Sequence, residues 1–143
     1  MSDQTWTRET IHDEMRTIIA ETRGVEEDQC TLEATCFGDL GLESIDFLEI
    51  SFRMEDVWGF PYYTDDLGEA MNSIGIGSTP EDVREALKIL RVKLYLEVPD
   101  ELPGVEPLDP KVLSDSMSNL FTVGHLVTFV ERSLAAEAAA SAG

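Results

Sequence analysis

The sequence predicts an all-α protein whose helices form an antiparallel bundle of the four-helix type, elaborated by an insert. Apolar residues recur at helical spacing near both ends of the chain and in two central stretches. Residues that start or stop helices lie at the borders of these stretches. The chain of 143 residues is 43% hydrophobic, which is enough to build the core of one domain. We therefore expect a single domain over residues 1–143.

The first helix is expected from about Thr7 to Arg23. Its apolar stripe falls at i, i+4, i+7 and i+11 and consists of Ile11, Met15, Ile18 and Thr22. Gly24 follows as a stop signal, because glycine readily takes the left-handed conformation that ends helices. Residues 25–43 show no clear period, so we expect a loop held to the core by isolated apolar anchors. These anchors are Val25, Leu32, Phe37, Leu40 and Leu42.

The second helix is expected from Ser44 to about Val57, with Pro61 beyond its end. It has two apolar rows. One row consists of Ile50, Met54 and Trp58, and the other of Ile45, Leu48 and Phe52. A helix of this kind either lies deep in a core or packs one row inward and offers the other to a partner.

A further helix is expected over residues 80–95. Thr79 can cap it, Pro80 suits the first helical position, and acids follow in the first turn. Beyond Leu90 the apolar residues alternate at strand period, but a lone strand has no partner in a helical bundle, so we expect the helix to continue. Residues 99–110 hold four prolines and four acids and predict a loop.

The last helix is expected after Thr122, which can cap it. Its buried stripe consists of Val123, Leu126, Val127, Val130 and Leu134. The tail from Ala135 to Gly143 is alanine-rich and has no capping residue, so we expect it to fray.

Composition limits the environment and the partners. The chain has 29 acidic and 10 basic residues and a net charge of −19, which repels nucleic acid and anionic lipid headgroups. No stretch approaches the length of a membrane span, and the N-terminus has no basic, apolar leader. We expect a cytoplasmic protein that neither binds nucleic acid nor inserts into membranes. Cys30 and Cys36 are expected to be free thiols, at least partly buried.

Ser44 is the most informative position, because it stands where an apolar helix begins. Gly41 precedes it and allows a sharp turn. The first turn of a helix presents unpaired N–H groups and the positive end of the helix dipole, so it favours a phosphate ester. The same features also fit an ordinary helix cap.

The run Asp39-Leu40-Gly41-Leu42-Glu43-Ser44-Ile45-Asp46 resembles the phosphopantetheine-attachment motif of acyl carrier proteins, Asp-Leu-Gly-x-Asp-Ser-Leu. Glu43 replaces the usual Asp and Ile45 the usual Leu. Residues 8–25, 45–60 and 120–134 resemble the first, second and last helices of that family. The resemblance covers residues 7–66 and 119–135, whereas residues 67–118 match no ordinary carrier protein and are taken as an insertion.

The resemblance implies an acyl carrier protein rather than an enzyme. Ser44 would carry a covalent 4'-phosphopantetheine arm from coenzyme A, flanked by Gly41, Leu42, Glu43 and Ile45. The arm would hold acyl chains as thioesters for fatty-acid, specialised lipid or polyketide biosynthesis. The implied partners are a phosphopantetheinyl transferase (holo-synthase), and ketosynthase and acyltransferase enzymes with basic docking patches. We expect a monomer.

The resemblance also implies two surfaces on the second helix. The docking surface would consist of Ile45, Asp46, Leu48, Glu49, Phe52, Glu55 and Asp56. The acyl pocket would be lined by Phe47, Ile50, Met54 and Trp58. Phe47 is bulky where many carriers have a small residue, so it either lines or shortens the pocket or belongs to the core.

Residues 44–52 are similar to specialised carriers that deliver very long or hydroxylated acyl chains to lipid A, and to related carriers of aryl-polyene-type pathways. The inserted helix could widen the core for such a chain. It could instead lay its bases near the acidic second helix, or be a stabilising elaboration with a solvated basic face. These bases are Arg84, Lys88, Arg91 and Lys93.

Other classes fit less well. An unmodified carrier-like interaction module has no need of an intact attachment motif. Peptidyl and aminoacyl carriers usually have Gly-Gly-His/Asp-Ser and less acidity. A serine hydrolase would need a Gly-x-Ser-x-Gly elbow, which is absent, while His12 lies off the apolar stripe and His125 beside a buried row. No catalytic residues and no metal ligands are expected.

Overall fold

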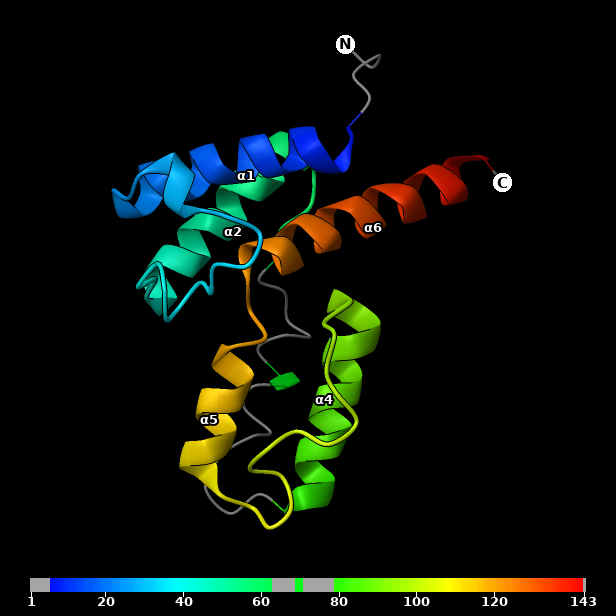
Figure 1. Cartoon of the computed structure of the whole chain (residues 1–143). Helices are drawn as coiled ribbons and strands as arrows, with labels where there is room; N and C mark the ends of the chain where they lie inside the picture. The colour runs from blue at the N-terminus through cyan, green and yellow to red at the C-terminus, as the bar shows by residue number, and fades with distance from the viewer. Residues whose placement is uncertain (1–5, 63–68, 71–78, 143) are drawn as a thin grey trace.

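The computed structural model describes residues 6–62, 69–70 and 79–142, with only the backbone of Ser44, Ser141 and Ala142. Its regular structure within these residues is all helical, as the sequence predicted (Figure 1). The elements are α1 (Arg8–Arg23), the short 3-10 helix η1 (Glu27–Gln29), α2 (Ser44–Trp58), α4 (Pro80–Leu94), α5 (Pro110–Ser118) and α6 (Val123–Ala142).

Helices α1, α2 and α6 form the bundle, in which α1 packs against both of the others (Figure 1). The local chemistry sets the bounds of α1. Thr7 caps its start by accepting a hydrogen bond from the Thr10 N–H, and Gly24 ends it with a left-handed φ of 81°. The buried residues of α1 are Ile11, Met15, Ile18 and Ile19, which include three of the four predicted stripe positions. Thr22, the fourth, is only partly buried.

The connection between α1 and α2 is bound to the start of α6 by main-chain hydrogen bonds. Cys36 N–H donates to the Phe121 carbonyl at 2.8 Å, and Val123 N–H donates to the Ala34 carbonyl at 3.0 Å. Leu40 and Leu42 are buried, while the other predicted anchors, Val25, Leu32 and Phe37, are partly buried against the same core. This long loop is therefore fixed at several points rather than at its ends alone.

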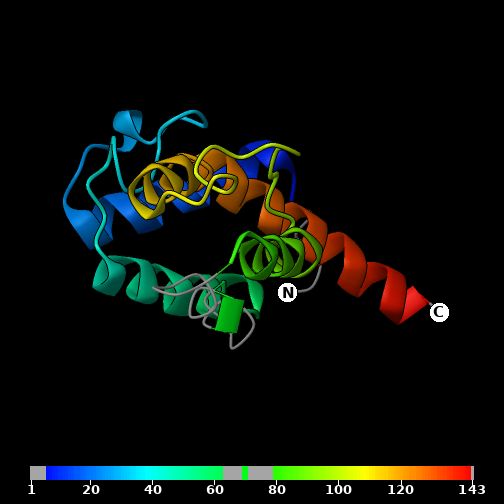
Figure 2. The same ribbon diagram turned by 90° about the horizontal axis from the view of Figure 1, so that it is seen from below.

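Helices α4 and α5 lie below the bundle, and their axes run across the direction of α1 (Figures 1 and 2). Helix α4 continues past Leu90 to Leu94, and Tyr95 ends it with a φ of 59°, so the residues at strand period do not form a strand. The following loop packs closely on α5, because a Cβ added at Gly104 would lie 2.3 Å from the Leu113 nitrogen. Only glycine fits there.

Two features at the end of the chain differ from the expectations. Helix α5 begins at Pro110, the last residue of the predicted loop, and was not predicted. Asp109 caps it and Pro110 occupies its first turn. Helix α6 continues to Ala142, where fraying was expected, and its end projects beyond the other helices (Figure 2). Its predicted stripe is buried as far as Val130, and Leu134 is partly buried.

A polar pair lies inside the aromatic part of the core. The Tyr62 hydroxyl and His125 Nε2 are 2.6 Å apart, and both side chains are buried. Burial lowers the pKa of His125 from 6.5 to about 4 and raises that of Tyr62. His125 is therefore neutral at physiological pH, and its ring nitrogen shares one hydrogen bond with the Tyr62 hydroxyl.

This pair predicts a loss of stability in mild acid. Because the folded-state pKa of His125 is lowered, the stabilisation is present above pH 6.5 and is lost as the pH falls towards 4. The shift corresponds to at most about 3 kcal/mol of unfolding free energy. Urea unfolding at about pH 7 and about pH 4.5 should show this loss in the wild type and a smaller one in His125→Gln.

His12→Gln is the matched control and should keep the pH dependence of the wild type. Comparing variants also removes the opposite contribution of the many carboxylates, whose mutual repulsion falls in acid. An equal loss in the wild type and in His125→Gln would contradict the assignment to His125.

Candidate functional site

Ser44 is the first residue of α2, at the end of a tightly wound turn. The turn is closed by two reciprocal hydrogen bonds, in which Thr35 N–H donates to Asp39 Oδ2 at 3.0 Å and Asp39 N–H donates to Thr35 Oγ1 at 2.8 Å. Gly41 then reverses the chain with a φ of 66°, as expected for this position. The side chain of Ser44 lies outside the described part of the structure.

The first turn of α2 is capped by its own carboxylate. Asp46 Oδ2 accepts a hydrogen bond from the Glu43 N–H at 2.9 Å, and the carboxylate is mostly buried. Asp46, expected in the docking surface, is thus turned back towards the turn. The remaining acidic members of that set, Glu49, Glu55 and Asp56, are exposed.

Arg23 is a neighbour of this turn that the sequence analysis did not connect with it. Its Nη1 lies 3.6 Å from Asp46 Oδ2, and its Nη2 would lie 3.7 Å from a Cβ added at Gly41. The guanidinium therefore pairs with Asp46 and occupies the space that a side chain at position 41 would approach. The position of Arg23 in the last turn of α1 was visible in the sequence, but its proximity depends on how α1 and α2 pack.

The two apolar rows of α2 have different environments. Ile50, Met54 and Trp58 are buried, whereas Ile45, Leu48 and Phe52 are 72%, 38% and 57% exposed. The helix therefore packs one row inward and presents the other to solvent. Exposed large apolar side chains in a row beside carboxylates are typical of a surface that meets a partner.

The residues expected to line an acyl pocket are packed together in the core. The Phe47 ring lies 5.4 Å from both Phe37 and Tyr62, in tilted or edge-to-face contact. The Trp58 ring makes an edge contact with Trp6 at 5.4 Å. Among the described residues, hollows of about 460, 470 and 310 Å³ lie elsewhere, and the four expected residues line none of these.

The histidines and cysteines are engaged away from the serine. His12 is partly buried rather than simply exposed, and its Nε2 lies 2.8 Å from the Cys30 carbonyl oxygen. His125 is bound to Tyr62. Both cysteines are free and buried, and they form no disulfide with each other. Burial raises the pKa of Cys36 to about 12, so Cys36 stays a neutral thiol. In the described ranges no cluster of His, Cys, Asp or Glu is arranged to hold a metal ion.

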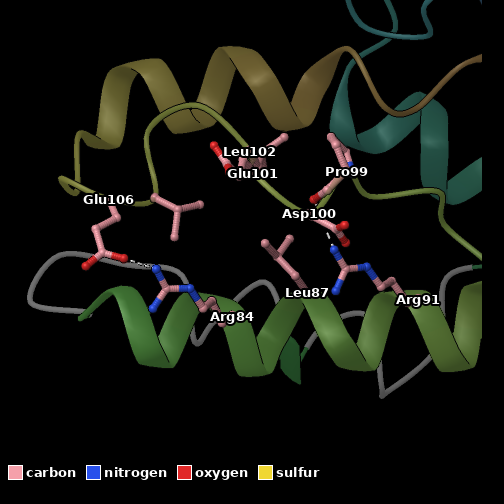
Figure 3. Close-up of a pocket in the computed structure, with 9 residues that line it drawn as sticks. Arg84, Leu87, Arg91, Pro99, Asp100, Glu101, Leu102 and Glu106 are labelled. Atoms are coloured by element: carbon pink, nitrogen blue, oxygen red, sulfur yellow. Dashed lines mark hydrogen bonds and ion pairs between the residues drawn. The ribbon is translucent and has the colours of Figure 1, made fainter.

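Two bases of α4 bind the loop that follows this helix. Arg84 forms an ion pair with Glu106, and Arg91 donates to the Pro99 carbonyl at 3.0 Å (Figure 3) and to the Val98 carbonyl at 2.9 Å. Between the two arginines, Leu87 and Leu102 face one another across a hollow (Figure 3). No ion pair found among the described side chains joins α4 to the acids of α2.

Curated proteins similar to this chain are acyl carrier proteins. The acyl carrier protein of Coprothermobacter proteolyticus is 28% identical over 88 residues, which are 62% of this chain and 95% of that protein. The acyl carrier protein AcpXL of Brucella melitensis is 32% identical, over 57% of this chain and 85% of its own length. The acyl carrier protein of Thermotoga maritima is 35% identical, over 48% and 83%.

No model of a protein family matches the chain, and no solved structure matches it significantly. The similarity to these relatives nevertheless extends over most of their lengths, and the chain belongs to the acyl carrier protein family. Acyl carrier proteins are carriers, not enzymes. Over the residues described, no helix has the length and apolar character that crossing a membrane requires.

The contrast between the two sides of α2 predicts different effects of two similar substitutions. Phe47→Ala removes a ring that is 6% exposed and in contact with other rings, so it should cost about 3 kcal/mol or more of unfolding free energy. Phe52→Ala removes an exposed ring and should change stability by about 0.5 kcal/mol or less. Urea unfolding of both variants checks this, and equal losses would contradict the rotation of α2.

Proposed function

We propose that this protein carries acyl chains on a 4'-phosphopantetheine arm esterified to Ser44. The observation that carries the proposal is the motif at residues 39–46. Within it, Gly41 takes a left-handed φ and α2 begins at Ser44. The first N–H groups of α2 and its dipole favour a phosphate at this end of the helix. Membership of the acyl carrier protein family supports the same role.

The chemistry of loading follows from a serine and coenzyme A. The Ser44 hydroxyl oxygen would form a bond to phosphorus while the phosphoanhydride bond of coenzyme A breaks. The serine would lose its proton, and the nucleotide half of coenzyme A would leave. The arm then ends in a thiol that holds an acyl group as a thioester, and the chain itself supplies no catalytic group.

The exposed side of α2 is proposed as the docking surface for the enzymes that load and use the arm. Ile45, Leu48 and Phe52 form its apolar centre, and Glu49, Glu55 and Asp56 form its acidic rim. An acidic rim speeds the encounter with basic patches without making the complex tight. A phosphopantetheinyl transferase, a ketosynthase and an acyltransferase are the partners that such a surface fits.

The acyl chain is proposed to belong to fatty-acid, specialised lipid or polyketide biosynthesis. An acyl group entering the bundle beside Phe47, Ile50, Met54 and Trp58 would have to displace side chains that are now buried together. Similarity to AcpXL supports a specialised carrier, as do residues 44–52.

Incubation with coenzyme A and a promiscuous phosphopantetheinyl transferase tests the proposal. Intact mass should show the gain of one phosphopantetheine group on the wild type and none on Ser44→Ala, because the ester requires the serine hydroxyl. Thr79→Ala is the matched control, since it removes a hydroxyl from another helix start and should leave the gain unchanged. A folded wild type that gains no mass would contradict the proposal and favour an unmodified interaction module.

The docking surface predicts a rate effect that is independent of folding. Leu48→Ser and Phe52→Ser should each lower kcat/KM for the transferase about tenfold, because truncating a central interface side chain costs about 1 kcal/mol or more. Val92→Ser, at an apolar position of α4 that is 64% exposed, should leave the rate unchanged. Equal effects at all three positions would place the docking surface elsewhere.

A further inference from the structure

The side chain of Arg23, from the end of α1, lies next to the first turn of α2, which belongs to a strongly acidic part of the chain. Residues 26–66 hold 12 acidic residues and one base, Arg53. Arg53 is already paired with Glu21 at 2.5 Å. Arg23 reaches into this region from the end of α1, where its guanidinium pairs with Asp46 and points towards the open side of Gly41. A negative group added in the first turn of α2 would therefore share that turn with the Asp46 carboxylate and the cation of Arg23.

The present bond of Arg23 leaves much of its capacity unused. Its contact with Asp46 is 3.6 Å, longer than a hydrogen bond, and no hydrogen bond from Arg23 is found among the described residues. A guanidinium has five N–H donors in a fixed planar fork, which matches the geometry of phosphate oxygens. Arg23 is also 39% exposed, so a new ligand can approach it.

The backbone of Ser44 lies in the turn that Arg23 approaches. Ser44 and Asp46 belong to the same first turn of α2, and two residues of a helix rise by about 3 Å. Gly41 lies on the other side of Ser44 along the chain, and it has no side chain between Arg23 and the turn. Arg23 therefore approaches the chain at residues 41 and 46, which lie on either side of Ser44 in the sequence.

We propose that Arg23 is the phosphate-positioning residue of this carrier, whose guanidinium bridges Asp46 and the phosphodiester once Ser44 is modified. The inference rests on the proposed function, because it needs a phosphodiester at Ser44. It adds a residue of α1 to the site and assigns it a chemical role. The phosphodiester has a single negative charge, which the guanidinium offsets beside the nearby carboxylates.

A simpler role for Arg23 is to join α1 to α2 in the unmodified protein. Arg53 offers a matched comparison, because its pair with Glu21 joins the same two helices away from Ser44. A purely structural ion pair contributes equally with and without the arm. A phosphate-positioning residue contributes more when the arm is present, so the two roles differ in their dependence on modification.

The experiment measures unfolding equilibria of the unmodified and modified forms of the wild type, Arg23→Gln and Arg53→Gln. In Arg23→Gln the ratio of folded to unfolded protein should fall about fivefold more in the modified form than in the unmodified form, as for a charge-assisted contact in partial solvent. Arg53→Gln should lower this ratio by the same factor in both forms. The phosphorus NMR resonance of the modified protein should move in Arg23→Gln, stay in Arg53→Gln and move less in Arg23→Lys.

Equal losses in the two forms of Arg23→Gln, together with an unmoved phosphorus resonance, would overturn the proposal. The resonance gives an answer even where a variant is too unstable for a full unfolding curve. Failure of this inference is distinct from failure of the proposed function. In the first case the wild type is modified and Arg23 has no preference for the modified form, whereas in the second the wild type gains no phosphopantetheine at all.

Discussion

The burial of one side of α2 is the constraint on which the rest of the site depends. Phe47, Ile50 and Met54 are held in the core, which fixes the rotation of the helix about its axis. Once that rotation is set, Leu48 and Phe52 have to face solvent. The same packing thus produces a buried row and an exposed apolar row on one helix.

The start of α2 is held from outside the helix as well. The turn before it is bound to α6 through the Cys36 N–H and the Phe121 carbonyl, while Arg23 approaches it from α1. On the proposed function, these contacts would hold the attachment point still while the arm moves. Helix α4 makes its described ion pair elsewhere, between Arg84 and Glu106 of the loop before α5.

Helix bounds were predictable where capping chemistry is local, as at Thr7 and Thr79, and the resemblance to an attachment motif rested on residues 39–46 alone. Helix α5 was missed because its Asp109-Pro110 start lies inside a proline-rich stretch that also fits a loop. The sequence left open which row of α2 is buried. It also could not place Arg23 beside Asp46, because that depends on the packing of two helices.

The central claim is that Ser44 serves as a carrier site in the cell. The most direct measurement is the intact mass of the protein purified from the organism that makes it, before and after mild hydroxylamine, which cleaves thioesters. Our interpretation predicts a mass above that of the chain by a phosphopantetheine arm and an acyl group, with hydroxylamine removing only the acyl group. A chain that is found wholly unmodified would contradict it.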